Sequence, residues 1–104
     1  MPEFIFAYHG GKPPENDADM EKTMADWRSW FEGMGNAVVN PGNPVGMSKT
    51  VSSTGVSDDG GANPVSGYSI VMADSIQSAV RMARDCPMVK DGSGSVEVAE
   101  IHEM

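Results

Sequence analysis

The chain has 104 residues, a formal charge of -8, 39% hydrophobic residues and a single cysteine. This length suits one domain, spanning residues 1–104, with one modest hydrophobic core. A strongly acidic chain repels phosphate backbones and anionic membrane surfaces, which argues against nucleic-acid binding. The lone Cys86 excludes an internal disulfide and a cysteine-based zinc site, and it fits a reducing, cytoplasmic setting.

We expect no signal peptide, membrane helix, metal or cofactor. The first eleven residues, MPEFIFAYHGG, lack the basic and long apolar regions of a signal peptide. No apolar run approaches the roughly 20 residues of a membrane helix. The two histidines have no partners at the spacing of metal ligands, and the paired glycines lack the spacing of a phosphate-binding loop.

The first third of the chain predicts a strand followed by a long helix. Glu3–His9 alternates two largely apolar faces, which is typical of an interior strand that is covered on both sides. Asn16 or Asp17 then caps a helix that runs to about Met34, and Gly35 is a natural C-terminal stop. The buried stripe of this helix is expected to comprise Met20, Met24, Trp27, Phe31 and Met34, with Trp30 beside it.

The middle of the chain is rich in proline, glycine and serine. Ala37–Val39 is predicted as a short strand that leads into a shaped loop at Asn40–Lys49, NPGNPVGMSK. Met47–Ser53 is expected to be extended, with a serine-rich face suited to a sheet edge or a cavity wall. Thr54–Asn63 is predicted as a loop of roughly ten residues, and long ordered loops are often functional.

The last third predicts a strand, a helix and a closing strand. Gly67–Ala73 is the clearest strand, and Asp74 with the glutamine three residues later has the pattern of a capping box. The Cys86-Pro87 step stops the second helix, and Ser95–Ile101 forms the closing strand. The buried stripe of the second helix is expected to comprise Ile76, Ala79, Val80 and Ala83.

This β-α-β-β-α-β order predicts a ferredoxin-like α+β fold, in which an antiparallel sheet carries two helices on one face. Such a sheet leaves its second face uncovered, and here that face still carries apolar residues. A second copy of the chain is the most economical cover. We therefore predict a homodimer in which two sheets face each other, a dimeric α+β barrel.

Several stretches together point to a known family. They are the opening strand, the tryptophan-bearing helix, the loop NPGNPVG, the stretch SGYSIVMADSIQSAVRMARDCP and the closing GSVEVAEI. In these stretches the chain resembles the YCII-related family, also called DGPF-domain proteins, along nearly its whole length. The most specific parts are the Gly-Tyr strand that passes into D-S-x-x-x-A-x-x-x-A and Cys-Pro, and the closing G-S-V-E-V.

The resemblance implies a homodimeric α+β barrel with a cleft between sheet and loops. It also implies that some members are enzymes with a His and an Asp as an acid–base pair, whereas others have no established activity. This chain departs from the family in two places. Asp58–Gly61 reads DDGG near where the family often has Asp-Gly-Pro-Phe, and the first helix has no histidine, since the two histidines are His9 and His102. A His–Asp mechanism therefore cannot be transferred by position.

Two residues are catalytic candidates. His9 ends the first strand beside a glycine pair, and histidine is the usual proton shuttle near neutral pH. The alternative is a histidine that is exposed or hydrogen-bonds a loop carbonyl. Asp26 in the first helix is the nearest carboxylate that could pair with a histidine, and its alternative is a solvated helix residue. Glu97 gains interest only if it is buried; at a dimer rim it is a surface charge.

Five residues are candidate ligand contacts. Ser48 and Lys49 follow the proline-rich loop, but neighbours on a strand point to opposite faces, which favours a binding role for either residue over joint nucleophilic catalysis. Asn63, Ser66 and Tyr68 supply the donors and acceptors that orient a small ligand. The alternative is hydrogen bonding within the loop by the first two, with Tyr68 packed on the sheet.

We interpret the chain as a cytoplasmic homodimer that binds a small organic molecule in a cleft, with lyase- or hydrolase-like acid–base chemistry in which His9 transfers the proton. The alternative is a non-catalytic ligand-binding or regulatory module. A third interpretation is an interaction protein whose partner is itself.

Overall fold

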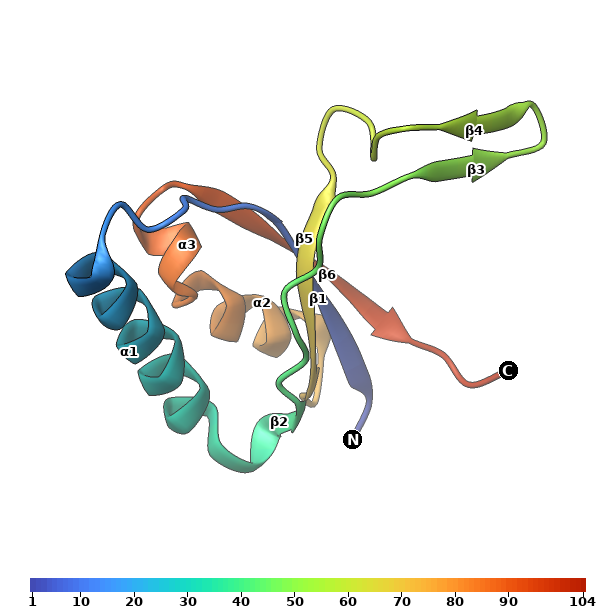
Figure 1. Ribbon diagram of the computed structural model, residues 1–104. Helices are drawn as coiled ribbons and strands as arrows, with labels where there is room; N and C mark the ends of the chain where they lie inside the picture. Colours follow the sequence, from blue (N-terminus) through green and yellow to red (C-terminus); the bar gives the residue numbers. More distant parts are fainter.

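Helices cover one face of a four-stranded antiparallel sheet, and a separate β-hairpin projects away from it (Figure 1). The computed structural model describes residues 1–104. In chain order the elements are β1 (Glu3–Gly10), α1 (Asp17–Met34), the 3-10 helix η1 (Gly35–Ala37), β2 (Val38–Asn40), β3 (Thr50–Ser52), β4 (Gly55–Ser57), β5 (Val65–Met72), α2 (Ile76–Arg84), α3 (Pro87–Lys90) and β6 (Gly94–Ile101).

The four strands of the sheet lie in the order β2-β5-β1-β6, and every neighbouring pair is antiparallel. β1 is therefore an interior strand, as its two apolar faces predict. Ile5 of β1 faces Ile70 of β5 on one side and Ala99 of β6 on the other. The predicted ferredoxin-like α+β fold is confirmed. The β3–β4 hairpin is inserted in the chain between β2 and β5.

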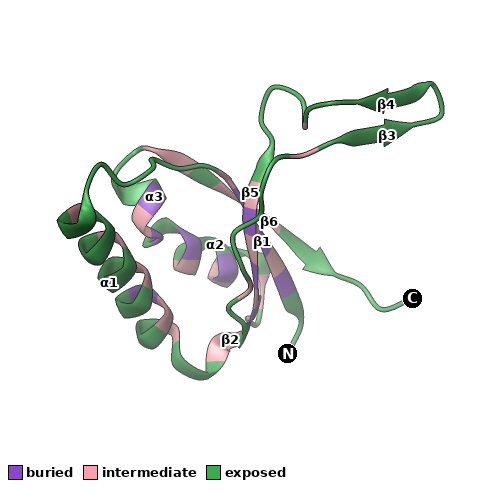
Figure 2. Ribbon diagram, viewed as in Figure 1, coloured by how far each residue is buried: buried purple, intermediate pink, exposed green.

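The hydrophobic core lies between the helices and the inward face of the sheet (Figure 2). Phe4, Phe6 and Tyr8 alternate into this space, and Phe6 stacks on Trp30 of α1 with ring centroids 6.0 Å apart. The indole N–H of Trp30 donates to the carbonyl oxygen of Met82 at 3.0 Å, which ties α1 to α2. Other buried core side chains are Ser69, Val71, Ala73, Ala79, Ala83, Cys86 and Met88.

Helix α1 begins and ends where the sequence predicts. The Asn16 side chain accepts the backbone N–H of Asp19 at 2.8 Å, and Gly35 ends the helix with a φ of +56°. The predicted buried stripe is partly wrong, because Met20 and Met24 are 52% and 58% exposed. The rest of the stripe is confirmed: Trp27, Phe31 and Met34 pack against the core, with Trp30 the buried residue of the helix.

The N-cap of helix α2 lies one residue later in the chain than the sequence predicts. Ser75, not Asp74, is the N-cap, and its hydroxyl oxygen accepts the backbone N–H of Ser78 at 3.2 Å. The predicted Asp74 capping box is therefore wrong. The chain also forms the short helix α3 directly after the predicted stop, because proline suits the first position of a helix and Pro87 follows Cys86 there.

The buried stripe of α2 is narrower than predicted. Ala79 and Ala83 are buried, whereas Ile76 and Val80 are 44% and 37% exposed. The two alanines let the helix approach the sheet closely, and the larger side chains that flank them lie at its margin.

The segments Met47–Ser53 and Thr54–Asn63 fold differently from the prediction. β3 and β4 pair with each other in a two-stranded sheet of their own, with Val51 opposite Val56. We call this hairpin, residues 50–57, the arm. The predicted edge segment is thus not part of the main sheet, and the predicted long loop contains a strand. The arm extends the molecule to a radius of gyration of 14.8 Å, against about 13 Å for a compact chain of this length.

The loop at residues 40–49 runs along β5 and is anchored to it. The hydroxyl of Ser69 donates to the carbonyl oxygen of Pro41 at 2.6 Å and accepts the phenol O–H of Tyr8 at 2.7 Å. Farther along, the backbone N–H of Val45 donates to the carbonyl oxygen of Ser66 at 3.0 Å. The loop therefore extends the short β2 edge and covers part of the free side of β5.

The second face of the sheet carries no helix, and we call it the open face. It is largely apolar around its centre, where Ile5, Ile70 and Met72 are half-buried. The open face is formed by Ile5, Ala7, His9, Ser66, Tyr68, Ile70, Met72, Ser95, Glu97, Ala99 and Ile101.

No helix of the structure combines the length and the apolar character that a membrane span requires.

Cys86 lies fully buried between α2 and α3 and forms no disulfide. Burial raises the pKa of its thiol from 9.0 to about 11. Well below pH 9 the thiol is protonated in both the folded and the unfolded chain, so it does not change the free energy of unfolding there. From pH 9 to pH 11 only the unfolded thiol ionises, so we expect stability to fall by about 2–3 kcal/mol. Urea unfolding across this range measures the loss.

The variant Cys86→Ala is the matched control, because it lacks the thiol and should lack this slope. Burial also raises the pKa of the Tyr8 phenol, so both proteins should lose further stability above pH 10. Parallel stability curves for the wild type and the variant between pH 9 and pH 10 would contradict the buried-thiol account.

Candidate functional site

His9 lies at the end of β1 on the open face, where β1 meets the segment that leads into β5. Its side chain is only 12% exposed. β5 carries a bulge here, since Tyr8 pairs with Gly67 and His9 with Val65, so that Ser66 has no partner residue on β1. Bulges are common next to functional sites because they change the direction of a side chain.

Both nitrogens of the His9 ring face oxygen atoms. Nδ1 lies 2.9 Å from the carbonyl oxygen of Asn63 and 3.2 Å from that of Pro64. Carbonyl oxygens only accept hydrogen bonds, so Nδ1 is the donor. Nε2 lies 3.0 Å from Oε1 of Glu97. The carbonyls therefore fix the ring orientation and the Nδ1 proton, and they leave Nε2 as the nitrogen that exchanges a proton with a carboxylate or a ligand.

Glu97 reaches His9 from β6, where it pairs with Ala7 in the antiparallel register. Its side chain is 70% exposed, so it can rotate away from Nε2 without disturbing the core. The exposed carboxylate also makes the ion pair weak as a stabilising contact. A bound molecule could therefore take the place of Glu97 at Nε2.

The predicted pairing of His9 with Asp26 is not present. Asp26 lies on α1, on the helix side of the sheet, and its carboxylate binds the ammonium group of Lys22 at 2.9 Å. His9 lies on the opposite side of the sheet. The helical pattern of α1 could not reveal this separation, because it depends on which face of β1 the helix covers.

Glu97 is the residue that takes the place of Asp26 beside His9, although it is not buried. Sequence reasoning identified it as a strand residue but did not connect it to His9. The usable signal was the strand order of the ferredoxin-like fold, in which the last strand pairs with the first. Counting from the paired glycines Gly10 and Gly94 places Glu97 diagonally across from His9 on the same face.

The five predicted ligand contacts separate into two groups. Lys49 lies next to the arm and forms an ion pair with Asp58 at 2.8 Å, while Ser48 packs against Gly60 at the base of the arm. Neither side chain has a contact with His9. Asn63 does contact His9, but through its backbone carbonyl and not through its amide group.

Ser66 and Tyr68 lie on the open face beside the His9 position. The hydroxyl of Ser66 is buried and has no hydrogen-bond partner. Buried polar groups nearly always have a partner, so this hydroxyl marks a place where a ligand or a water molecule would complete the hydrogen bonding. Tyr68 is half-buried opposite Ala7, and its side chain forms no hydrogen bond. His9, Glu97, Ser66 and Tyr68 together form the candidate site.

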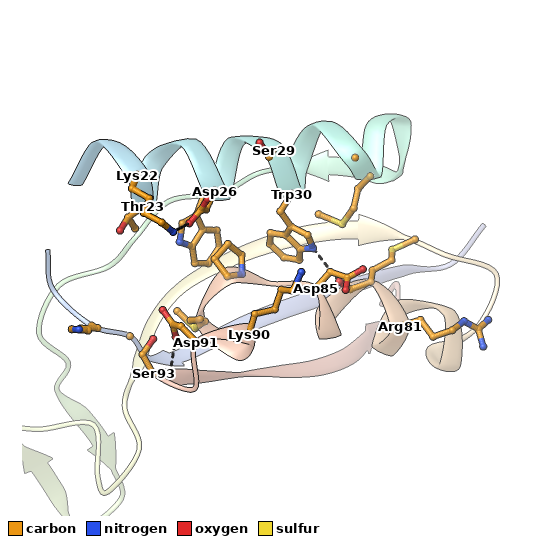
Figure 3. Close-up of a pocket in the computed structure, with 18 of the residues that line it drawn as sticks. Lys22, Thr23, Asp26, Ser29, Trp30, Arg81, Asp85, Lys90, Asp91 and Ser93 are labelled. Carbon is orange, nitrogen blue, oxygen red and sulfur yellow. Dashed lines mark hydrogen bonds and ion pairs between the residues drawn. The ribbon is translucent and has the colours of Figure 1, made fainter. Parts of the chain in front are cut away.

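A groove of about 1170 Å3 lies between α1 and the α2–α3 segment (Figure 3). Asp26 and Lys22 are on its α1 wall. The groove does not include His9 or any other residue of the candidate site. The structure holds no group of three or more His, Cys, Asp or Glu side chains arranged to bind a metal ion.

No protein-family model matches the chain, and no curated protein sequence matches it. A solved structure does. It is 5-chloro-2-hydroxyhydroquinone dehydrochlorinase (TftG) from Burkholderia phenoliruptrix AC1100, in a complex with 2,5-dihydroxybenzoquinone. The two chains are 14% identical, and the match covers 100% of this chain and 96% of the other with a TM-score of 0.60. At this identity the likeness concerns the fold alone: this chain shares its α+β architecture with TftG.

Proposed function

We propose that the protein is a homodimer that binds a small oxygen-bearing organic molecule at His9, with Glu97 as the partner that exchanges a proton. The observation that carries this proposal is the hydrogen bonding of the His9 ring. Two backbone carbonyls hold Nδ1 at 2.9 and 3.2 Å, and an exposed carboxylate lies 3.0 Å from Nε2. This arrangement holds one nitrogen in place and leaves the other for chemistry.

The open face supports the proposed dimer. A sheet with Ile5, Ile70 and Met72 on a face without helices exposes apolar surface that association would remove from water. A second copy brings the same surface, and two such sheets packed together form a dimeric α+β barrel. His9 and Glu97 would then lie at the edge of the interface. We further propose membership of the YCII-related family, because the stretches that resemble it span nearly the whole chain, and a cytoplasmic location, since a single free cysteine suits a reducing compartment.

The chemistry that this site favours is a lyase-like proton transfer. With Nδ1–H held by the carbonyls, Nε2 can take a proton from an acidic carbon or hydroxyl of the bound molecule. When the bound molecule leaves Nε2, Glu97 returns to it, accepts that proton and releases it to water, because its carboxylate is exposed. The hydroxyl of Ser66, in the bulge of β5 next to the His9 pairing, has no hydrogen-bond partner and is the donor proposed for a substrate oxygen. TftG, with the same fold, was solved with a dihydroxyquinone, which makes this compound class the first to test.

A non-catalytic module is the second candidate, and one observation favours it. The His9 ring already has a partner at each nitrogen, and its Nδ1 bonds tie β1 to residues 63 and 64 at the foot of the arm. A histidine in this position can serve as a structural connection that shapes a binding surface without taking part in a reaction.

The variants His9→Gln and Glu97→Gln test the site with 2,5-dihydroxybenzoquinone as the probe. We expect the probe to raise the melting temperature of the wild type and to bind His9→Gln roughly tenfold more weakly, because a charge-assisted hydrogen bond is lost. Thermal unfolding with and without the probe gives both results. His102→Gln is the matched control, since His102 is 79% exposed near the C-terminus.

Two outcomes separate the candidates, and two others would contradict the site or the compound class. Exchange of the ring C–H protons of the probe with deuterated solvent, if His9→Gln abolishes it, supports the enzyme. Binding without such exchange supports the module. Equal stabilisation of wild type, His9→Gln and Glu97→Gln would contradict a site at His9. No stabilisation of the wild type would contradict the proposed compound class.

A further inference from the structure

The groove between α1 and the α2–α3 segment is separate from the site at His9, because it lies on the helix side of the sheet (Figure 3). Its volume is about 1170 Å3. Small-molecule sites in proteins have volumes of roughly 300–1,000 Å3. The groove can therefore hold one small molecule together with water.

Both tryptophans of the chain line this groove. The indole N–H of Trp30 is occupied by the carbonyl oxygen of Met82, whereas that of Trp27 has no hydrogen-bond partner in the protein. Trp27 is half-buried, and its ring lies edge-on to Tyr8 with centroids 5.1 Å apart. The groove thus offers aromatic surface with one unused donor, which suits a planar ring that bears an acceptor.

Charged side chains gather along the walls of the groove. It holds four of the seven Lys and Arg residues of the chain but only four of its fifteen Asp and Glu residues. The groove is therefore formally neutral in a chain with a charge of -8. A small anion would be repelled less strongly here than over the remaining surface.

Two charged residues of the groove, Lys90 and Asp85, have no partner within the protein. By contrast, Lys22 and Asp26 form an ion pair at 2.9 Å. Lys90 at the end of α3 and Asp85 at the end of α2 form neither an ion pair nor a side-chain hydrogen bond, although both line the groove. Figure 3 shows the Lys90 side chain lying between α3 and α1. The groove therefore presents Lys90 as a cation and Asp85 as an acceptor with no side-chain bond inside the protein, whereas the Arg81 guanidinium donates to the hydroxyl of Ser78.

Gly33 keeps the α1 wall of the groove open. It is the next-to-last residue of α1, and a methyl group there would meet no atom within 4 Å. The wall of the groove is therefore open at this end of the helix.

We propose that this groove binds a small aromatic carboxylate that also carries a hydroxyl group. The carboxylate pairs with the Lys90 ammonium and accepts the free indole N–H of Trp27. The hydroxyl donates to the Asp85 carboxylate, and the ring lies against the tryptophans. This site is additional to the one at His9 and does not depend on it.

The test uses 4-hydroxybenzoate as the probe and the uncharged 4-hydroxybenzamide as its matched control. Proton–nitrogen NMR spectra resolve the two indole N–H groups, and Trp27→Phe identifies the peak of Trp27. We expect a saturable shift of the Trp27 indole peak with the carboxylate, a smaller shift of the Trp30 peak, and binding of the amide that is roughly tenfold weaker.

Variants then locate the interaction. Lys90→Gln should weaken binding of 4-hydroxybenzoate roughly tenfold, and Lys90→Arg should restore most of the affinity because it keeps the charge. Lys49→Gln, which removes an exposed lysine at the arm, should have no effect. His9→Gln should also leave this binding unchanged, so failure here is distinct from failure at His9.

The proposal is overturned if the Trp27 peak does not move at millimolar 4-hydroxybenzoate. It is equally overturned if the amide binds as tightly as the carboxylate, or if Lys90→Gln binds as tightly as the wild type. A loss of binding in Lys49→Gln or His9→Gln would show that the probe binds elsewhere.

Discussion

The variant Gly42→Ala is expected to destabilise the fold by about 3 kcal/mol. Gly42 has a φ of +69°, which costs about 1–2 kcal/mol for a residue with a side chain. Its added methyl group would also overlap the carbonyl oxygen of Tyr68. The loop must then move, which breaks the backbone bonds from Tyr68 to Asn43 and from Val45 to Ser66, each worth about 1 kcal/mol. Urea unfolding measures the loss.

Gly46→Ala is the matched control in the same loop. A methyl group at Gly46 meets no atom within 4 Å, and its φ is not positive. This variant should change stability by less than about 1 kcal/mol, and in the stabilising direction, because alanine restricts the unfolded chain. If the two variants unfolded at the same urea concentration, the close approach of the loop to β5 would be wrong.

Ile70→Asp is expected to convert the proposed dimer into a monomer. Ile70 is half-buried in the middle of the open face, opposite Ile5. In the dimer it would be covered by the second copy, so a carboxylate there would lose its hydration without a partner charge. The helix side of the sheet is not touched, so the monomer should keep its fold. Sedimentation velocity reports the mass, and circular dichroism reports the fold.

Met24→Asp serves as the control for this experiment. Met24 is 58% exposed on α1, far from the open face, and it receives the same added charge. This variant should remain dimeric. A dimer that survives Ile70→Asp, or one that Met24→Asp also disrupts, would show that the two copies do not meet through the open face.

The sequence specified the main sheet and its helices because their signals are local. The alternation of Phe4, Phe6 and Tyr8 marks β1, and Asn16 and Gly35 mark the ends of α1. The interior position of β1 also followed from its two apolar faces. Each of these features depends on neighbouring residues and on a short repeat, so no knowledge of distant contacts was needed.

The arm was not predictable in the same way. Val51 and Val56 alternate with polar residues over only three residues each, and the glycines and aspartates around them are typical of a loop. Whether such a segment joins the main sheet or pairs with itself depends on the space left beside β5. That space is already taken by the loop at residues 40–49, a long-range effect that periodicity does not report.

The candidate site was predicted in part. A strand end beside glycines was sufficient to select His9, and Ser66 and Tyr68 lie beside it on the open face. The predicted pairing of Asp26 with His9 was wrong, because Asp26 lies on the helix side of the sheet and binds Lys22. Glu97 was not assigned to His9 because that contact joins the first strand to the last, and a single sequence gives that register only after the strand order is known.

In the proposed homodimer, two copies of this chain pack their open faces together, with His9 and Glu97 at the edge of the interface. The mass of the unmodified protein in solution tests this directly, measured by light scattering during gel filtration at micromolar concentration. We expect twice the chain mass of 11.0 kDa. A mass of 11.0 kDa across the accessible concentration range would contradict it.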